Sequence, residues 1–261
     1  MADAPVLREL DDGVLRVTLN RPDKKNAFDD PQWDGLRDAM NDAREDPSVA
    51  VMLLTGAGAD FSSGQDLGAF GGAQEPREDG HANGYHAASR AVAAFDKPLV
   101  VAAKGVAVGG GATLLLHGDL IYVGASLRLR LPFVSLGLVP EFASSYVLQQ
   151  MIGTRRAAEL FYTASWVDAQ RAVEVGIATA AVADDQLLEV ALAKAREIAQ
   201  YPVTSLQETK RTLMTAHRAG VRAAFEAEDA GMAKQAGSPE NVEAVTAFLQ
   251  KRQPDFSQFR K

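Results

Sequence analysis

Two short runs of apolar residues in the first half of the chain predict buried strands. Residues 50–54 are wholly apolar and precede Thr55-Gly56, and residues 98–103 precede Lys104-Gly105. Continuous apolar runs of this length that end at a glycine are typical of strands covered on both faces of a sheet. Because loops at the ends of such strands are firmly mounted, they are good positions for a functional site.

The rest of the front half predicts further regular elements. Apolar and polar residues alternate over residues 14–19, which predicts a half-exposed strand. Pro31 opens a helix that we expect to reach about Arg44, and residues 120–123 predict a third buried strand. Residues 68–84 hold five glycines and few large apolar residues, so we expect a surface loop near the pocket.

Helical periodicity dominates the second half of the chain. The pattern predicts helices over residues 169–175, 186–199, 206–219, 221–236 and 241–251. No repeat of fixed period and no low-complexity tract is present. A chain of 261 residues fits a single α/β domain, in which we expect residues 1–200 to form the core and residues 201–261 a helical region of the same domain.

Composition and charge exclude several classes of protein. With 47% hydrophobic and 23% charged residues, and no uninterrupted apolar stretch of about 18 residues, the chain is typical of neither disordered nor membrane proteins. The formal charge of −7 argues against a nucleic-acid binder, because phosphate neutralisation needs a basic face. The absence of cysteine excludes disulfides and thiolate chemistry. The chain shows neither a secretory leader nor a terminal Ser-Lys-Leu address, so we expect a cytoplasmic location.

The glycine-rich segment at residues 105–111 matches no common phosphate-binding motif. It fails both the G-x-G-x-x-G pattern and the Walker pattern, which disfavours a nucleotide cofactor. A G-x-S-x-G nucleophile elbow and an H-E-x-x-H motif are both missing from the sequence. The four histidines show no metal-ligand spacing. We therefore expect neither a metal ion nor a separate cofactor.

Two loops remain as candidates for chemistry. Residues 61–67 follow one predicted strand, and residues 108–113 follow another and run into an apolar helix over residues 114–117. Glycines allow close approach of the backbone to a ligand, and free N–H groups at a helix start attract anions. Two converging donors of this kind would form an oxyanion hole. The alternative for each loop is a tight connection, with Asp66 acting only as a helix N-cap.

Taken together, four segments resemble the crotonase (enoyl-CoA hydratase/isomerase) family. They are Asn20-Arg21-Pro22 and residues 61–67, 105–111 and 118–122, in the family's order. The resemblance covers nearly the whole chain. It implies a spiral of ββα units with a helical C-terminal trimerisation region, and a homotrimer or dimer of trimers. It also implies an acyl-CoA substrate, of which coenzyme A is a part. By motif position, the N–H groups of Gln65 and Gly110 would hold the thioester oxygen.

The same resemblance separates two reactions. Hydration in this family uses two glutamates, and the matching positions here are Thr113 and Phe133, neither of which is a credible base. Residues 131–146 are similar instead to the Pro-Glu-Gly-Cys-Ser-Ser region of Δ3,Δ2-enoyl-CoA isomerases. Glu141 matches the catalytic carboxylate of that region, whereas Phe142-Ala143 departs from it.

A single carboxylate is enough for isomerisation. Glu141 would take a proton from C2 and return it at C4, while an apolar wall formed partly by Phe133 excludes water and raises the basicity of the carboxylate. The alternative for Glu141 is a solvent-facing residue in the first turn of a helix that starts at residue 143 or 144, where the helix dipole favours a negative charge.

Further positions are expected to contact the substrate. Lys24, Lys25 and Lys251 are candidates to meet the phosphates of CoA, although exposed lysines are mostly solvated surface. The residues expected to line the site are Ser63, Asp66, Thr113, Phe133 and Phe142. The length of the acyl chain is left open.

Two other functions stay open at this point. One is a hydratase or specialised acyl-CoA lyase of the same family, with Glu141 working alone or with His81 or His86. The other is a non-catalytic acyl-CoA-binding protein that keeps the pocket without the chemistry. Neither alternative involves nucleic acid or a membrane.

Overall fold

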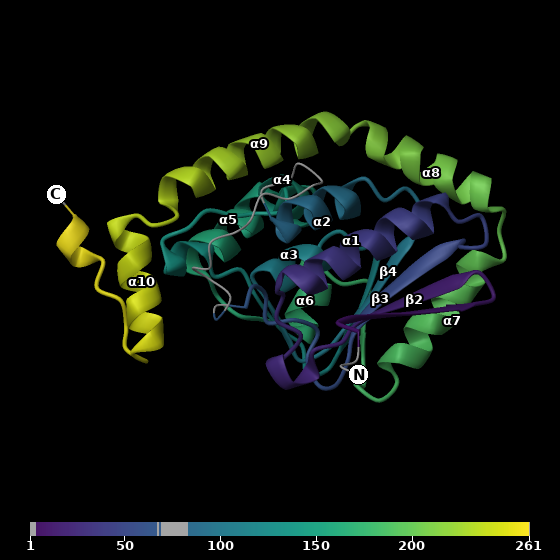
Figure 1. Cartoon of the computed structure of the whole chain (residues 1–261), viewed down its shortest axis with the longest axis horizontal. Helices are drawn as coiled ribbons and strands as arrows, with labels where there is room; N and C mark the ends of the chain where they lie inside the picture. The colour runs from purple at the N-terminus through teal and green to yellow at the C-terminus, as the bar shows by residue number, and fades with distance from the viewer. Residues whose placement is uncertain (1–3, 67, 69–82, 261) are drawn as a thin grey trace.

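A six-stranded sheet lies at the centre of the computed structural model, which describes residues 4–66, 68 and 83–260 (Figure 1). Its order is β1-β2-β3-β4-β6-β9, with β1 antiparallel to β2 and the other neighbours parallel. The strands are β1 Val6–Asp11, β2 Val14–Leu19, β3 Val51–Gly56, β4 Leu99–Ala103, β6 Leu120–Gly124 and β9 Ala180–Val182.

The apolar pattern correctly predicted the interior of this sheet. Every residue of β4 is buried, as are the first four of β3, because both strands have covered faces on each side. The alternating pattern over residues 14–19 is β2, and the apolar run at 120–123 is β6. Strand β1 was not predicted, since four of its six residues are exposed at the edge of the sheet.

A second, three-stranded sheet orders β5-β7-β8, whose strands are Val106–Val108, Arg128–Arg130 and Val167–Asp168. Strands of two or three residues carry too little alternation to be recognised from sequence. This small sheet nevertheless matters for the site, because β5 is part of the glycine-rich segment at residues 105–111 and ends directly before Gly109.

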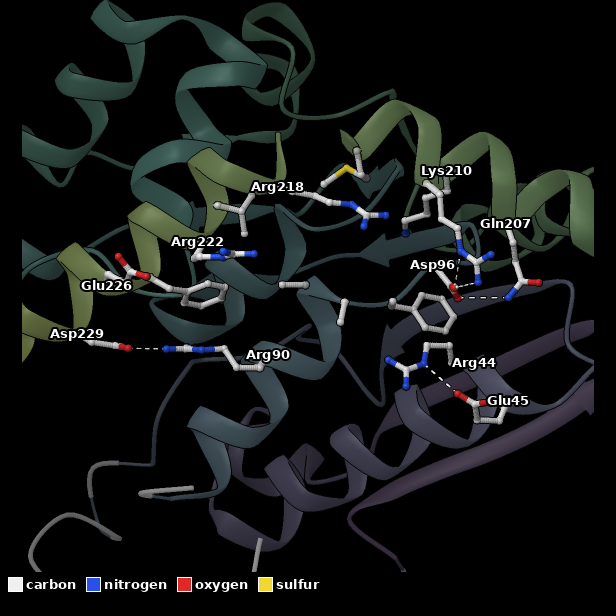
Figure 2. Close-up of a pocket in the computed structure, with 17 residues that line it drawn as sticks. Arg44, Glu45, Arg90, Asp96, Gln207, Lys210, Arg218, Arg222, Glu226 and Asp229 are labelled. Atoms are coloured by element: carbon white, nitrogen blue, oxygen red, sulfur yellow. Dashed lines mark hydrogen bonds and ion pairs between the residues drawn. The ribbon is translucent and has the colours of Figure 1, made fainter. Parts of the chain in front are cut away.

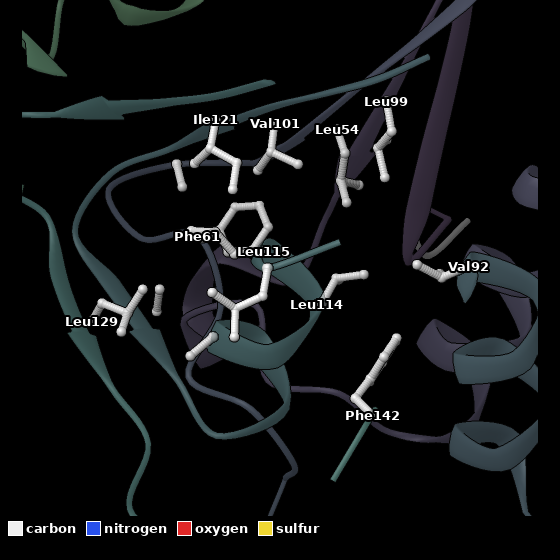
Figure 3. Close-up of a cluster of buried hydrophobic side chains, with 14 of the residues drawn as sticks. Leu54, Phe61, Val92, Leu99, Val101, Leu114, Leu115, Ile121, Leu129 and Phe142 are labelled. Carbon is white, nitrogen blue, oxygen red and sulfur yellow. The ribbon is translucent and has the colours of Figure 1, made fainter. Parts of the chain in front are cut away.

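Helices cover both faces of the large sheet. The helices are α1 Asp30–Glu45, α2 Gly84–Ala93, α3 Gly110–Leu115, α4 Ser144–Ile152, α5 Thr154–Thr163, α6 Ala169–Val175, α7 Leu187–Ala199, α8 Val203–Thr215, α9 Arg218–Gln235 and α10 Pro239–Leu249. Helix α7 packs on β3, β4 and β6 and encloses a smaller core on one face. The larger core on the other face includes Leu54, Leu99, Leu114 and Phe142 (Figure 3).

The helical predictions hold with shifted boundaries. The break between α8 and α9 falls at residues 216–217 rather than at 220, and α3 begins at Gly110 rather than at 114. The expected loop over residues 68–84 is wrong at its end, because Gly84 is the first residue of α2 and Asn83 caps that helix through its side chain. Residues 69–82, His81 among them, lie outside the described residues.

The rear of the chain forms an extended helical arm. Helices α8 and α9 run as one long arc over the molecule, and α10 stands at the end of that arc beside the C-terminus (Figure 1). Helix α10 carries exposed apolar side chains, with Phe248 59% and Leu249 70% exposed. Within the described part of the chain, no helix is long and apolar enough to cross a membrane.

Candidate functional site

The two loops singled out by sequence are bound to each other through their main chains. The N–H of Ser62 donates to Val106 O at 2.9 Å, and the N–H of Val108 donates to Ser62 O at 3.0 Å. The Ser62 hydroxyl in turn accepts from the N–H of Gly64 at 3.1 Å. This ladder pairs the segment after β3 with β5, the strand that leads to Gly109 and Gly110.

Glycines make the close approach of these loops possible. A Cβ on Gly64, whose φ is +84°, would lie 2.5 Å from Val108 O and 3.2 Å from Gly110 N. A Cβ on Gly111 would lie 2.4 Å from Ser62 O. Gly109 has φ 53° and ψ −123°, a conformation that side chains exclude. Each of these positions therefore requires glycine.

The arrangement leaves two main-chain donors free. The N–H of Phe28 donates to Gly64 O and the N–H of Asp66 donates to Phe28 O, both at 2.8 Å, so the intervening N–H of Gln65 points away from that pairing. The N–H of Gly110 starts α3 and has no intrahelical acceptor. Within residues 4–66, 68 and 83–260 neither N–H has an acceptor. A pair of unmet donors on touching loops is suited to hold an oxygen that gains negative charge.

Glu141 lies against one of these donors, the N–H of Gly110. Its Oε1 would be 3.3 Å from a Cβ on Gly110, so the carboxylate faces the start of α3. Helix α4 begins only at Ser144, after Glu141, and Glu141 is partly buried. The alternative of a solvent-facing residue in the first turn is therefore wrong. Burial raises the pKa of Glu141 to about 7, and the negative charge of Glu228 adds to the effect.

Aromatic side chains lie beside the residues that supply the two donors and beside Phe142, which follows Glu141. Trp33 on α1 would lie 3.4 Å from a Cβ on Gly110, and its Nε1 donates to Gln65 Oε1 at 2.9 Å. Tyr85 on α2 stands edge-on to Trp33, with ring centroids 5.5 Å apart, and edge-on to Phe142 at 5.8 Å. These rings supply the apolar environment that disfavours ionisation of Glu141.

The role of Phe133 in an apolar wall stays a prediction, and other aromatic rings lie at the site. Phe133 is buried on the 3₁₀ turn η3, Phe133–Leu136, and its ring centroid is 6.5 Å from that of Phe161. Trp33 and Tyr85, which sequence reasoning missed, are the rings found beside Gly110 and Phe142. Nothing in their local sequence marks them, because α1 and α2 meet only in the folded chain.

Three side chains hold the turn that follows Glu141. Phe142 and Ala143 are both left-handed, with φ 65° and 54°. The Tyr85 hydroxyl accepts from the N–H of Phe142 at 2.9 Å, and His117 Nε2 lies 2.8 Å from Phe142 O. Burial lowers the pKa of His117 to about 4, so the ring is neutral and must carry its proton on Nε2 to donate to this carbonyl.

Glu228 on α9 is the third of these side chains. Its two oxygens accept from the N–H groups of Ala143 at 2.7 Å and Ser145 at 2.8 Å, and the residue is 5% exposed. Glu228 is a second buried carboxylate near Glu141, and sequence reasoning missed it. A sequence signal existed, because Ala224, Phe225 and Glu228 share the buried stripe of α9 at helical spacing.

Several predicted substrate contacts cluster on the Gln65 side of the site. The N–H of Ser63 donates to Lys25 O at 2.9 Å, and Lys25 is exposed, with Nζ 3.7 Å from Asp60. Asp66 accepts from Arg21 and from the N–H of Gly68, each at 3.0 Å. Burial opposes ionisation of Asp66, yet these hydrogen bonds lower its pKa.

Two other predicted contacts lie apart from this cluster. The Thr113 hydroxyl is buried within α3 and donates to Gly110 O at 3.3 Å. Lys251 is exposed just after α10, and no contact among the described residues joins it to Gln65 or Gly110. Their roles, like those of Ser63, Asp66 and Phe142, stay predictions.

The described chain also has a groove that lies apart from these residues. A groove of about 890 Å³ runs between α8 and α9 on one side and the ends of α1 and α2 on the other (Figure 2). Arg218 and Arg222 extend into it from α9. None of Gln65, Gly110 and Glu141 lines it. We place the site by its chemistry instead, because free N–H donors and a base with a raised pKa meet at Gly110 and Glu141.

No metal-binding group of acidic and histidine side chains occurs within the described residues.

Known proteins resemble this chain from end to end. A family model described as enoyl-CoA hydratase/isomerase matches residues 9–260. Two similar proteins of Escherichia coli (strain K12) are 1,2-epoxyphenylacetyl-CoA isomerase, 31% identical over 97% of this chain and 98% of that protein, and 2,3-dehydroadipyl-CoA hydratase, 30% identical over 93% and 94%. The crystal structure of an enoyl-CoA hydratase/isomerase from Pseudoalteromonas atlantica T6c matches with a TM-score of 0.91 and 33% identity, covering 97% of this chain and 99% of that one.

Proposed function

Because this chain belongs to the enoyl-CoA hydratase/isomerase (crotonase) family, we propose that it moves the double bond of a 3-enoyl-CoA to the 2-position with Glu141 as its single base. Membership of an enzyme family that handles acyl-CoA thioesters, and a crotonase-like fold, confirm the resemblance drawn from the motifs. The observation that carries the finer proposal is the carboxylate of Glu141, with its raised pKa, set against Gly110.

The proposed reaction needs one proton carrier and one anion site. The Glu141 carboxylate takes a proton from C2, and the electrons of that C–H bond pass to the thioester oxygen as a dienolate forms. The N–H groups of Gln65 and Gly110 stabilise this oxygen, each worth about 2.7–4 kcal/mol in the barrier. Glu141 then returns the proton at C4, which leaves the double bond between C2 and C3. A pKa near neutrality suits a group that must both accept and give back a proton.

Isomerisation fits these residues better than hydration. Thr113 and Phe133 occupy the positions of the two hydratase glutamates, and both are buried. Glu228 supplies a second carboxylate, but its two oxygens already accept from the N–H groups of Ala143 and Ser145. It is therefore poorly placed to orient and activate a water molecule. The relatives named above include an isomerase and a hydratase. Water addition is therefore tested directly beside isomerisation.

Binding of the CoA moiety and assembly are further parts of the proposal. We assign Lys25 to a phosphate of CoA, since it is exposed beside Ser63 on the Gln65 side of the site. Lys251 would reach such a site only from the end of α10. A homotrimer or dimer of trimers would cover the exposed apolar side chains of α10, among them Phe248 and Leu249. No separate cofactor enters the proposed chemistry.

The proposal is tested by giving the purified protein a 3-enoyl-CoA and a 2-enoyl-CoA in parallel assays. Conjugation of the double bond with the thioester, followed by ultraviolet absorbance, is the expected result for the first substrate, with no water addition to the second. Water addition without conjugation would assign a hydratase or lyase instead. Binding of CoA esters in calorimetry without turnover of either substrate would assign a non-catalytic acyl-CoA-binding protein.

A further inference from the structure

We propose that Glu228 is a positioning residue for Glu141: from α9 it clamps the turn that carries the base and sets a second negative charge behind it. This inference rests on the proposed function for its catalytic meaning, but its geometry stands independently. Within the described residues, Glu228 accepts from the N–H groups of Ala143 and Ser145 and not from those of Gln65 and Gly110. It would act only through Glu141.

The contacts of Glu228 replace a side-chain cap that is missing at the start of α4. Ala143 occupies the N-cap position in a left-handed conformation, and its side chain cannot accept a hydrogen bond. The N–H of Ser144 finds an acceptor in Glu141 O at 3.1 Å, but the N–H groups of Ala143 and Ser145 need an acceptor from another element. The bidentate contacts of the Glu228 carboxylate, at 2.7 and 2.8 Å, supply it, and the positive end of the helix dipole favours that charge.

The clamp also determines where Glu141 stands. Phe142 is fixed on both sides of its peptide, by the Tyr85 hydroxyl at 2.9 Å and by His117 Nε2 at 2.8 Å. Glu228 binds the N–H groups of Ala143 and Ser145 that follow, so side chains from three separate parts of the fold hold three of the four residues after Glu141. A base displaced by about 1 Å can lose about a hundredfold in rate. Rigid support of this turn is therefore a catalytic requirement.

The second contribution of Glu228 is its charge. Burial of Glu228 raises its own pKa, but two N–H donors favour its ionised form. Its negative charge disfavours ionisation of Glu141, in addition to the larger effect of burial. The base is thereby stronger than an exposed glutamate.

Two ionisable side chains next to the turn, Tyr85 and His117, do not titrate with Glu141. Burial holds the pKa of Tyr85 well above 10 and that of His117 at about 4, so both are neutral near pH 7. Arg90 on α2 and Asp229 on α9 are paired with each other. Among the described residues, Glu228 is thus the charged group with the strongest effect on the pKa of Glu141.

The test is the titration of Glu141 in protein labelled with ¹³C at the glutamate side-chain carboxyl, assigned with Glu141→Gln. Glu228→Gln removes the charge and keeps one acceptor oxygen, and it is expected to move the titration midpoint of Glu141 to lower pH. Glu226→Gln is the matched control, because it removes the same charge from an exposed position on α9 and should leave the midpoint unchanged. An unchanged midpoint in Glu228→Gln, or an equal shift in the control, overturns the role of the charge.

A second variant separates the clamp from the charge. Glu228→Asp keeps the charge but shortens the side chain by one methylene, so the bidentate contact is lost. Its kcat for isomerisation is expected to fall at least about tenfold with little change in KM, because the base is displaced. A wild-type kcat in Glu228→Asp overturns the positioning role. If the protein turns over no 3-enoyl-CoA, the proposed function fails, while the ¹³C titration still decides whether Glu228 acts on Glu141.

Discussion

At the scale of single residues, Glu141 carries the proposed chemistry. Glu141→Gln keeps the size of the side chain but removes its basicity, so kcat for isomerisation should fall by about a hundredfold to ten-thousandfold. Binding of a non-reactive acyl-CoA should be unaffected, because the donors at Gln65 and Gly110 are main-chain groups. Steady-state kinetics and calorimetry on the same preparation measure both quantities. Turnover close to wild type would remove Glu141 from the mechanism.

The raised pKa of Glu141 has a second consequence that needs no substrate. A carboxyl whose pKa is about 7 when folded and 4.5 when unfolded binds its proton more tightly in the native state. Its contribution to the free energy of unfolding is therefore full below pH 4.5 and is lost as the pH rises through 7. Glu141→Gln should gain stability relative to wild type across this interval, by up to about 3 kcal/mol.

Urea unfolding at a series of pH values between 4.5 and 8 measures this difference. Glu226→Gln serves as the comparison, since it removes an exposed carboxylate from α9 and should show no such rise. A stability difference between Glu141→Gln and wild type that does not grow with pH would mean that the Glu141 carboxyl is solvated in the native state.

At the scale of elements, the site depends on how closely the loops after β3 and β5 approach each other. Gly64→Ala places a Cβ 2.5 Å from Val108 O and forces the loops apart, so the N–H of Gly110 loses its position. We expect kcat to fall by about a hundredfold or more, as for loss of one oxyanion donor. Gly237→Ala is the control, because its φ is +76° but nothing lies within 4 Å of its Cβ.

That pair of variants separates backbone strain from the clash. Both should lose about 1–2 kcal/mol of stability from the left-handed conformation alone, and only Gly64→Ala should lose activity. Thermal unfolding and kinetics of both proteins report the two effects. Equal loss of activity in both variants would show that the contact of the two loops is not needed for turnover.

The elements also show how far sequence reasoning reaches. The buried strands β3 and β4, and the glycine-rich loops after them, could be predicted because apolar runs and glycines are local signals. Trp33, Tyr85 and Glu228 could not be assigned to the site, because each reaches it only through the packing of α1, α2 and α9 around one turn. A polar residue on the buried stripe of α9 was the one local signal for Glu228.

At the scale of the whole molecule, the helical arm leaves apolar surface uncovered. Helix α10 contacts the body mainly at η3, where the Asn241 side chain donates to Leu136 O at 2.7 Å. Val242, Phe248 and Leu249 on the same helix are 55%, 59% and 70% exposed. An apolar surface on an extended arm is typical of an interface between subunits. This is the structural reason to expect assembly in addition to the family resemblance.

The expectation can be tested at α10 itself. Light scattering at micromolar concentration should give the mass of a trimer or hexamer for the wild-type protein. Phe248→Asp should shift it toward the monomer, because burial of an unpaired charge at an apolar interface costs several kcal/mol. Leu10→Asp is the control, since Leu10 is 47% exposed on β1, outside the helical arm, and should leave the assembly intact. A monomeric wild type would contradict the assembly. A stable trimer of Phe248→Asp would instead exclude this face of α10 from the interface.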